Sequence, residues 1–139
     1  MAINTGAFAR QLRKQASPTS LHKCAMYVRI ALEAGGAVTA GHPIDAKDYG
    51  PLLLRNGYCK LDPANTYVAQ QGDIAVIQPT SAGNCAGHIE GYDGSAWISD
   101  FIQSGFWPGP AYRKEEPSYA IYRLQTMPSS LNATPSKPL

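Results

Sequence analysis

Charged residues are scarce in this sequence, and neither sign dominates. They make up 16% of the 139 residues, against about 25% in an average domain, and 12 Lys and Arg against 10 Asp and Glu leave a net charge of +2. A protein that binds nucleic-acid phosphates carries a dense basic surface, which this composition does not supply. We therefore expect no nucleic-acid partner.

Long apolar runs are also missing. No stretch approaches the roughly 18 to 20 consecutive apolar residues that a membrane-spanning helix needs, so we expect no membrane insertion. Residues 1–18 lack the apolar run of about 7 to 15 residues found in a signal peptide. We expect synthesis in the cytoplasm, followed either by action there or by export along a route other than general secretion.

Apolar residues are nevertheless plentiful enough for one core. They make up 44% of a chain whose length suits a single domain, and 13 glycines with 11 prolines predict many turns and short strands. Residues 127–139 hold three prolines and few core-forming side chains. We expect one domain over residues 1–126 and a flexible C-terminal tail over residues 127–139.

Helices are predicted in the first part of the chain. Phe8 and Leu12, spaced i, i+4, predict a helix over residues 4–16, and a second apolar face predicts a helix over residues 21–34 that Gly35-Gly36 ends. A short helix is predicted over residues 46–58, where Pro51 fits poorly. The second apolar face consists of Leu21, Ala25, Val28 and Leu32, and its candidate N-caps are Ser17, Thr19 and Ser20.

Short apolar stretches predict strands in the second part of the chain. Asp93-Gly94 is a strong signal for a hairpin turn between two of them. Helices followed by antiparallel strands predict an α+β fold, with the helices packed on one face of the sheet. The predicted strands are residues 72–78, 85–92, 96–102 and 118–124.

Cys24 is the first candidate for chemistry, because it is placed in the first turn of the second predicted helix. The positive end of the helix dipole and the unpaired N–H groups there favour the thiolate, which is the nucleophilic form of cysteine. The ordinary alternative is a small apolar side chain in the core.

His88 and Asp100 supply the partners that a cysteine nucleophile needs, a general base and a group that orients the base. Both lie on the predicted hairpin. A two-residue turn would place His88 opposite Ser99, so an irregular hairpin is required to bring Asp100 to His88. Asp93 is the alternative third member.

Four stretches resemble a known family: KCAMYVRIALEAGG, GDIAVI, AGHIEGYDGSAWISDFIQ and FWPGPAYR. They are similar to the papain-like peptidoglycan amidases of the CHAP and NlpC type, and most of all to the small amidase effectors that type VI secretion systems deliver into rival bacteria. The resemblance covers about residues 20–124. It implies a papain-like fold, Cys24 as nucleophile, His88 as base and Asp100 as third residue, with the Cys24 N–H in the oxyanion hole.

The resemblance also implies a substrate, a partner and a place of action. The substrate would be an amide bond in the peptide stem or cross-link of peptidoglycan, hydrolysed in the periplasm of the target cell after injection. A cognate immunity protein would be the partner. Three alternatives remain open: a phage-type lysin, a cysteine peptidase or transamidase acting on protein, and a binding module in which Cys24 is a core residue.

The remaining candidates receive simpler interpretations. Cys59 and Cys85 either form a disulfide or stay as thiols, and thiols are favoured because nothing fixes their separation. Cys85 and His88 have the spacing of half a zinc site, but the second half is missing, so we expect no metal and no cofactor. His22, Ser99 and Gln103 are candidates to line the site, although surface or strand positions are their ordinary role.

Overall fold

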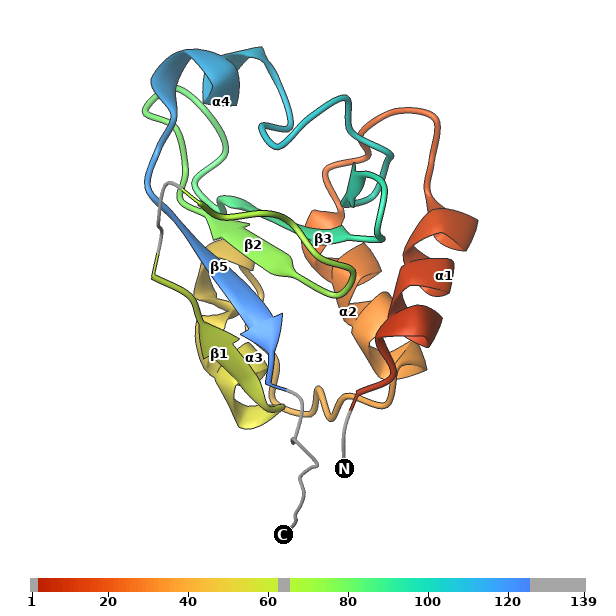
Figure 1. The fold of residues 1–139 in the computed structure, drawn as a ribbon. Helices are drawn as coiled ribbons and strands as arrows, with labels where there is room; N and C mark the ends of the chain where they lie inside the picture. Colours follow the sequence, from red (N-terminus) through yellow and green to blue (C-terminus); the bar gives the residue numbers. More distant parts are fainter. Residues whose placement is uncertain (1–2, 63–65, 126–139) are drawn as a thin grey trace, which may run out of the picture.

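The computed structural model describes residues 3–62 and 66–125. Helices and an antiparallel sheet form a small α+β fold, as expected (Figure 1). The expected tail, residues 127–139, lies outside the described residues. In chain order the elements are α1 (Thr5–Gln15), α2 (Cys24–Ala34), the 3-10 helix η1 (Ala46–Asp48), α3 (Gly50–Arg55), β1 (Tyr58–Lys60), β2 (Ile74–Ile77), β3 (His88–Tyr92), β4 (Trp97–Ile98), α4 (Pro110–Glu115) and β5 (Tyr119–Leu124).

The five strands form one sheet in the order β1-β5-β2-β3-β4, and every neighbouring pair is antiparallel. Side chains alternate between the two faces, and each face has its own apolar core. Ile74 and Val76 of β2 face the core that α1, α2 and α3 cover, whereas Ala75 and Ile77 face a second, aromatic-rich cluster. In Figure 1, α1 and α2 lie side by side and α4 lies apart from them.

The first two helices form where the apolar spacing predicted them. Phe8 and Leu12 of α1 are fully buried, and the Asn4 side chain caps the helix by accepting a hydrogen bond from the Ala7 N–H at 2.9 Å. Helix α2 starts three residues later than expected, at Cys24, and Lys23 at its N-cap position makes no side-chain capping bond. Leu21 therefore lies outside the helix and is 40% exposed. The expected capping by Ser17, Thr19 or Ser20 was wrong.

Further along the chain, the short helix expected over residues 46–58 is divided. Its first part is η1, its second part is α3 with Pro51 in the first turn, and its end belongs to β1 instead. Helix α4 forms in a segment for which the sequence predicted neither a helix nor a strand. Proline near the start of both α3 and α4 suits a first helical turn, because the missing N–H would have no partner there.

The hairpin between β3 and β4 has a wider turn than the Asp93-Gly94 signal predicted. Tyr92 pairs with Trp97, so four residues form the loop, and β4 has only two residues. The cause lies in the Asp93 side chain, whose Oδ1 accepts hydrogen bonds from the N–H groups of Ser95 and Ala96, each at 2.9 Å. This turn closed by an aspartate side chain replaces the two-residue turn, and the expected register was therefore wrong.

Candidate active site

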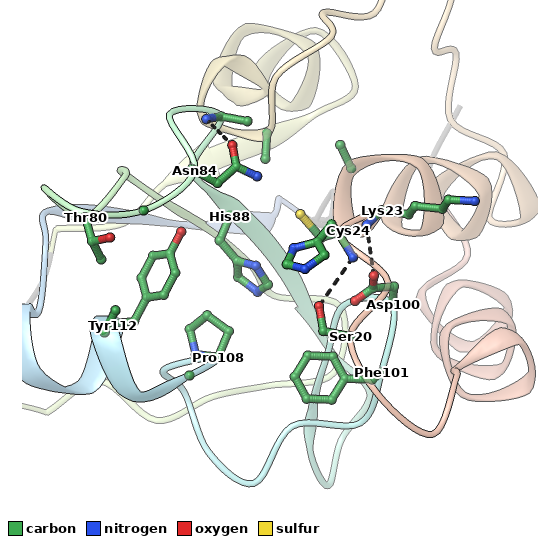
Figure 2. Close-up of a pocket in the computed structure, with 18 of the residues that line it drawn as sticks. Ser20, Lys23, Cys24, Thr80, Asn84, His88, Asp100, Phe101, Pro108 and Tyr112 are labelled. Carbon is green, nitrogen blue, oxygen red and sulfur yellow. Dashed lines mark hydrogen bonds between the residues drawn. The ribbon is translucent and has the colours of Figure 1, made fainter.

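Cys24 is the first residue of α2 and is half-buried at the edge of a cavity of about 570 Å³. The N–H groups of a first helical turn have no partner within the helix, and no other described residue accepts a hydrogen bond from the Cys24 N–H, so it can meet a ligand. Helix α2 packs on β3, and this contact brings the helix start close to the start of the strand. Figure 2 shows the thiol of Cys24 and the ring of His88 in the same pocket.

His88 is the first residue of β3 and is 8% exposed. Burial alone would lower the pKa of His88, but hydrogen bonding and charge from Cys24 and Glu90 outweigh it and raise that pKa. The strand begins tightly, since Gly87 has a φ of 74° and a Cβ at this position would lie 2.6 Å from the Ile77 carbonyl oxygen. Only glycine fits there, and the position of the His88 backbone is fixed accordingly.

The Nε2 atom of His88 is held by two side chains that sequence reasoning did not assign to it. The Oε1 atom of Gln103 lies 2.9 Å from Nε2, and the Oε1 atom of Glu90 lies 3.2 Å from it. Because both neighbours of Nε2 are oxygen atoms, this nitrogen carries the proton. The other ring nitrogen, Nδ1, is then the one left for the thiol of Cys24.

The Gln103 amide can adopt only one orientation. Its Nε2 donates to Glu90 Oε1 at 2.9 Å, to the Gly105 carbonyl at 3.0 Å and to the Phe106 carbonyl at 3.2 Å. Three oxygen acceptors on one side identify that end as the nitrogen, so the amide oxygen faces His88. Glu90 is fully buried, and burial raises its pKa although the hydrogen bonds from His88 and Gln103 act in the opposite direction.

Asp100 lies elsewhere in the site. Its carboxylate oxygen Oδ2 accepts hydrogen bonds from the N–H groups of Leu21 at 2.8 Å and Lys23 at 2.9 Å, and the residue is 1% exposed. Among the described residues, no hydrogen bond joins Asp100 to His88. Between the two bonded amides, His22 has a φ of 58°, a left-handed conformation that costs energy for a non-glycine residue. Asp100 thus holds the segment that leads into Cys24.

A tight turn between Asp100 and Gln103 directs their side chains to different elements. The Ser99 N–H donates to the Phe101 carbonyl at 3.1 Å, and the Gln103 N–H donates back to the Trp97 carbonyl at 2.9 Å. The chain therefore reverses immediately after β4. Asp100 at the turn points to the start of α2 (Figure 2), whereas Gln103, 5% exposed, returns to β3. The hairpin that was expected to carry Asp100 to His88 carries Gln103 there instead.

The other candidate residues lie as follows. Asp93 forms an ion pair with Arg13 at 2.6 Å and accepts a hydrogen bond from the Ser95 N–H in its own turn. Among the described residues, no hydrogen bond joins Asp93 to His88. Cys24, Cys59 and Cys85 are all free thiols. His22 is exposed and lines the cavity, whereas Ser99 is fully buried.

The described part of the chain offers neither a metal site nor a membrane-spanning helix. Residues 3–62 and 66–125 hold no group of three His, Cys, Asp or Glu side chains placed to bind a metal ion. Within the same residues, no helix is both long and apolar enough to cross a membrane.

Fold and site together define a small α+β protein with a cysteine–histidine pocket. Solved structures similar to this chain include the type VI effector–immunity complex Tae3–Tai3 from Ralstonia pickettii, with a TM-score of 0.77 and 41% identity over 88% of this chain and 99% of the other. The selenomethionine form of that complex gives a TM-score of 0.75 and 42% identity over 84% and 99%. The chain belongs to the family of the type VI effector Tae3. No family model and no curated protein matches it.

Proposed function

We propose that this protein is a thiol-dependent peptidoglycan amidase or endopeptidase with Cys24 as nucleophile and His88 as general base. The observation that carries the proposal is the pairing of a thiol at a helix start with a buried imidazole whose far nitrogen is already held by Gln103 and Glu90. Membership of the Tae3 family supports an enzyme that acts on the cell wall.

In the proposed reaction, Nδ1 of His88 takes the proton of Cys24, and the thiolate attacks the carbonyl carbon of the scissile amide. The negative charge on the tetrahedral intermediate is stabilised by the free N–H of Cys24 at the start of α2. His88 then gives its proton to the leaving amine as the C–N bond breaks. A water molecule, activated by the same imidazole, hydrolyses the acyl-enzyme and restores the thiol.

The third position of the site is shared between two residues in this proposal. Gln103 orients the His88 ring by accepting a hydrogen bond from Nε2–H. Asp100 is a positioning residue that anchors the backbone before Cys24 through the Leu21 and Lys23 N–H groups. Asp100 would thereby set the direction of the Cys24 N–H in the oxyanion hole. This role takes the place of the one expected for Asp100, as the partner of the imidazole.

The biological setting is proposed from the family. Injection by a type VI secretion system would place the enzyme in the periplasm of a rival bacterium, where it would act as an antibacterial toxin. The related structures are effector–immunity complexes, so we propose a cognate immunity protein as its partner. A phage-type lysin and a cysteine peptidase or transamidase acting on protein would use the same residues. The experiment below separates an enzyme that acts on protein from one that acts on the cell wall.

The test is digestion of purified sacculi by the wild type and by Cys24→Ala and His88→Ala. We expect the wild type to release muropeptides and each variant to lose at least about a thousandfold in rate while keeping the wild-type circular dichroism spectrum. Mass spectrometry of the products identifies the bond that is cut. Full activity of Cys24→Ala would disprove the thiol mechanism. Digestion of casein with intact sacculi left behind would point to the peptidase instead.

A further inference from the structure

Glu90 is a buried carboxyl group that the reaction above does not use. It lies on β3 two residues after His88, so both side chains point to the same face of the sheet. Its side chain has 0% exposure, and its Oε2 atom has no hydrogen-bond partner among the described residues. Burying a carboxylate with one oxygen unpaired is expensive, and such a group persists where a specific partner compensates for it.

The partner is the imidazole of His88. Glu90 Oε1 lies 3.2 Å from His88 Nε2 and accepts a hydrogen bond from Gln103 Nε2 at 2.9 Å. A neutral carboxyl group would carry its proton on Oε2, where no acceptor lies among the described residues, and both N–H donors face Oε1, so these contacts fit the ionised form. An opposite charge at this distance favours the charged form of the histidine.

Few other charges compete at this position. On β2, the residues paired with His88 and Glu90 are Ile77 and Ala75, which carry no charge. Lys47 of η1 lines a separate cavity. Helix α1 contacts β3 through Phe8 and Leu12 at Gly91, on the opposite face of the sheet. Among the described residues of other elements, Cys24 of α2 raises the pKa of His88, and Tyr112 of α4 places its ring 5.9 Å from the His88 ring.

We propose that Glu90 is the buried counter-charge of the His88 imidazolium, a positioning residue that keeps His88 protonated and its Nδ1 turned toward Cys24. The thiolate–imidazolium pair would then exist before substrate binds. Glu90 would stabilise the imidazolium charge at Nε2, and the Gln103 amide would fix the orientation of the ring. The inference rests on the proposed function, because only a thiol mechanism uses such a pair. Its test needs no peptidoglycan, so the role of Glu90 and the proposed amidase activity can be disproved independently of each other.

The first experiment is a histidine titration by NMR in the Cys24→Ala protein, which removes the thiol and leaves Glu90 as the remaining charge beside the ring. His22 and His42 serve as references in the same spectrum. We expect His88 to titrate above the ordinary value of about 6.5, and the added change Glu90→Gln to lower its pKa by about 1 to 3 units. A neutral His88 at pH 7 with Glu90 intact would overturn the proposal, even if Glu90→Gln fails to fold.

The second experiment measures the rate at which iodoacetamide alkylates Cys24, in a background of Cys59→Ser and Cys85→Ser. Glu90→Gln should slow alkylation at pH 6 by about tenfold or more, because the imidazolium that stabilises the thiolate is lost. The matched control is Asp73→Asn, which removes a fully buried carboxylate that lies directly before β2 and is paired with Arg123 outside the pocket. Equal alkylation profiles for Glu90→Gln and wild type would refute the inference.

Discussion

Replacing Gln103 by glutamate tests the hydrogen-bond network behind His88. The new carboxylate would place an oxygen where the Gln103 Nε2 now lies, 2.9 Å from Glu90 Oε1, and would remove the donor to the Gly105 and Phe106 carbonyls. Two charges about 4 Å apart repel by about 4 kcal/mol at an effective dielectric constant near 20. We expect the free energy of unfolding to fall by about 3 to 4 kcal/mol at pH 8.

The pH dependence follows from the same repulsion. Two close carboxylates raise the pKa of the pair in the folded state above its unfolded value, so the folded protein binds a proton more tightly. Gln103→Glu should therefore become more stable as the pH falls from 8 to 5. The double variant Glu90→Gln/Gln103→Glu restores one carboxylate and one amide, and it should recover about 2 kcal/mol or more relative to the sum of the single changes.

Urea denaturation of the wild type, the two single variants and the double variant, at pH 5 and pH 8, measures this cycle. A matched control is Cys59→Ser. The Cys59 thiol lies on β1, at the far edge of the sheet, and donates to Gln125, so this change should leave the coupling unchanged. The reasoning would be refuted by a Gln103→Glu protein as stable as wild type at pH 8. It would also be refuted by a double variant with no recovery.

Three further predictions concern the elements that hold the site. Asp100→Ala should lower the free energy of unfolding by about 2 to 4 kcal/mol and reduce sacculus digestion less than Cys24→Ala does, because the amides of Leu21 and Lys23 lose a buried acceptor. Unchanged stability in urea would contradict a role of Asp100 in holding the segment before Cys24. Burial raises the pKa of Asp93, but Arg13 and two turn N–H groups outweigh it and lower that pKa to about 2. The stability that Asp93 adds is thus complete above about pH 4 and lost as the pH falls toward 2, so Asp93→Ala and wild type should differ in thermal melting at pH 6 and converge near pH 2. Gly87→Ala should cost about 2 to 3 kcal/mol and most of the activity, since its Cβ would meet the Ile77 carbonyl at 2.6 Å; a melting curve like that of wild type would contradict the close approach.

The helices could be predicted from the sequence because their signals are local. The spacing of Phe8 and Leu12 and the stop at Gly35 are properties of neighbouring residues, and α1 and the end of α2 formed where they indicated. The start of α2 could not be read in this way. The group that satisfies its leading amides is Asp100, 77 residues away from Lys23, and no local pattern announces such a partner.

The residue that orients His88 could not be predicted from local sequence either. The sequence predicted Cys24 and His88 from a helix start and an apolar strand, and it predicted Asp100, on the second strand of the hairpin, as the residue that orients His88. Which residue reaches His88 depends on the register, and the register depends on how many residues the Asp93 side chain draws into the turn. Gln103 and Glu90 carried no separate sequence signal beyond their positions on or beside the hairpin.

The sequence by itself thus determined the α+β class, the first two helices and the two residues proposed for bond cleavage. These rest on apolar periodicity, helix-stop residues and the intrinsic chemistry of thiol and imidazole, all of which act over a few residues. Tertiary structure alone decided that Asp100 holds the start of α2 and that Gln103 and Glu90 hold His88. The contacts of Asp100 and Gln103 join residues that are distant in the chain, or that a shift of one register position would separate, so only the closed sheet and its turns could select them. Glu90 lies two residues after His88 on the same strand, and only the burial of that face makes its charge a partner of the imidazole.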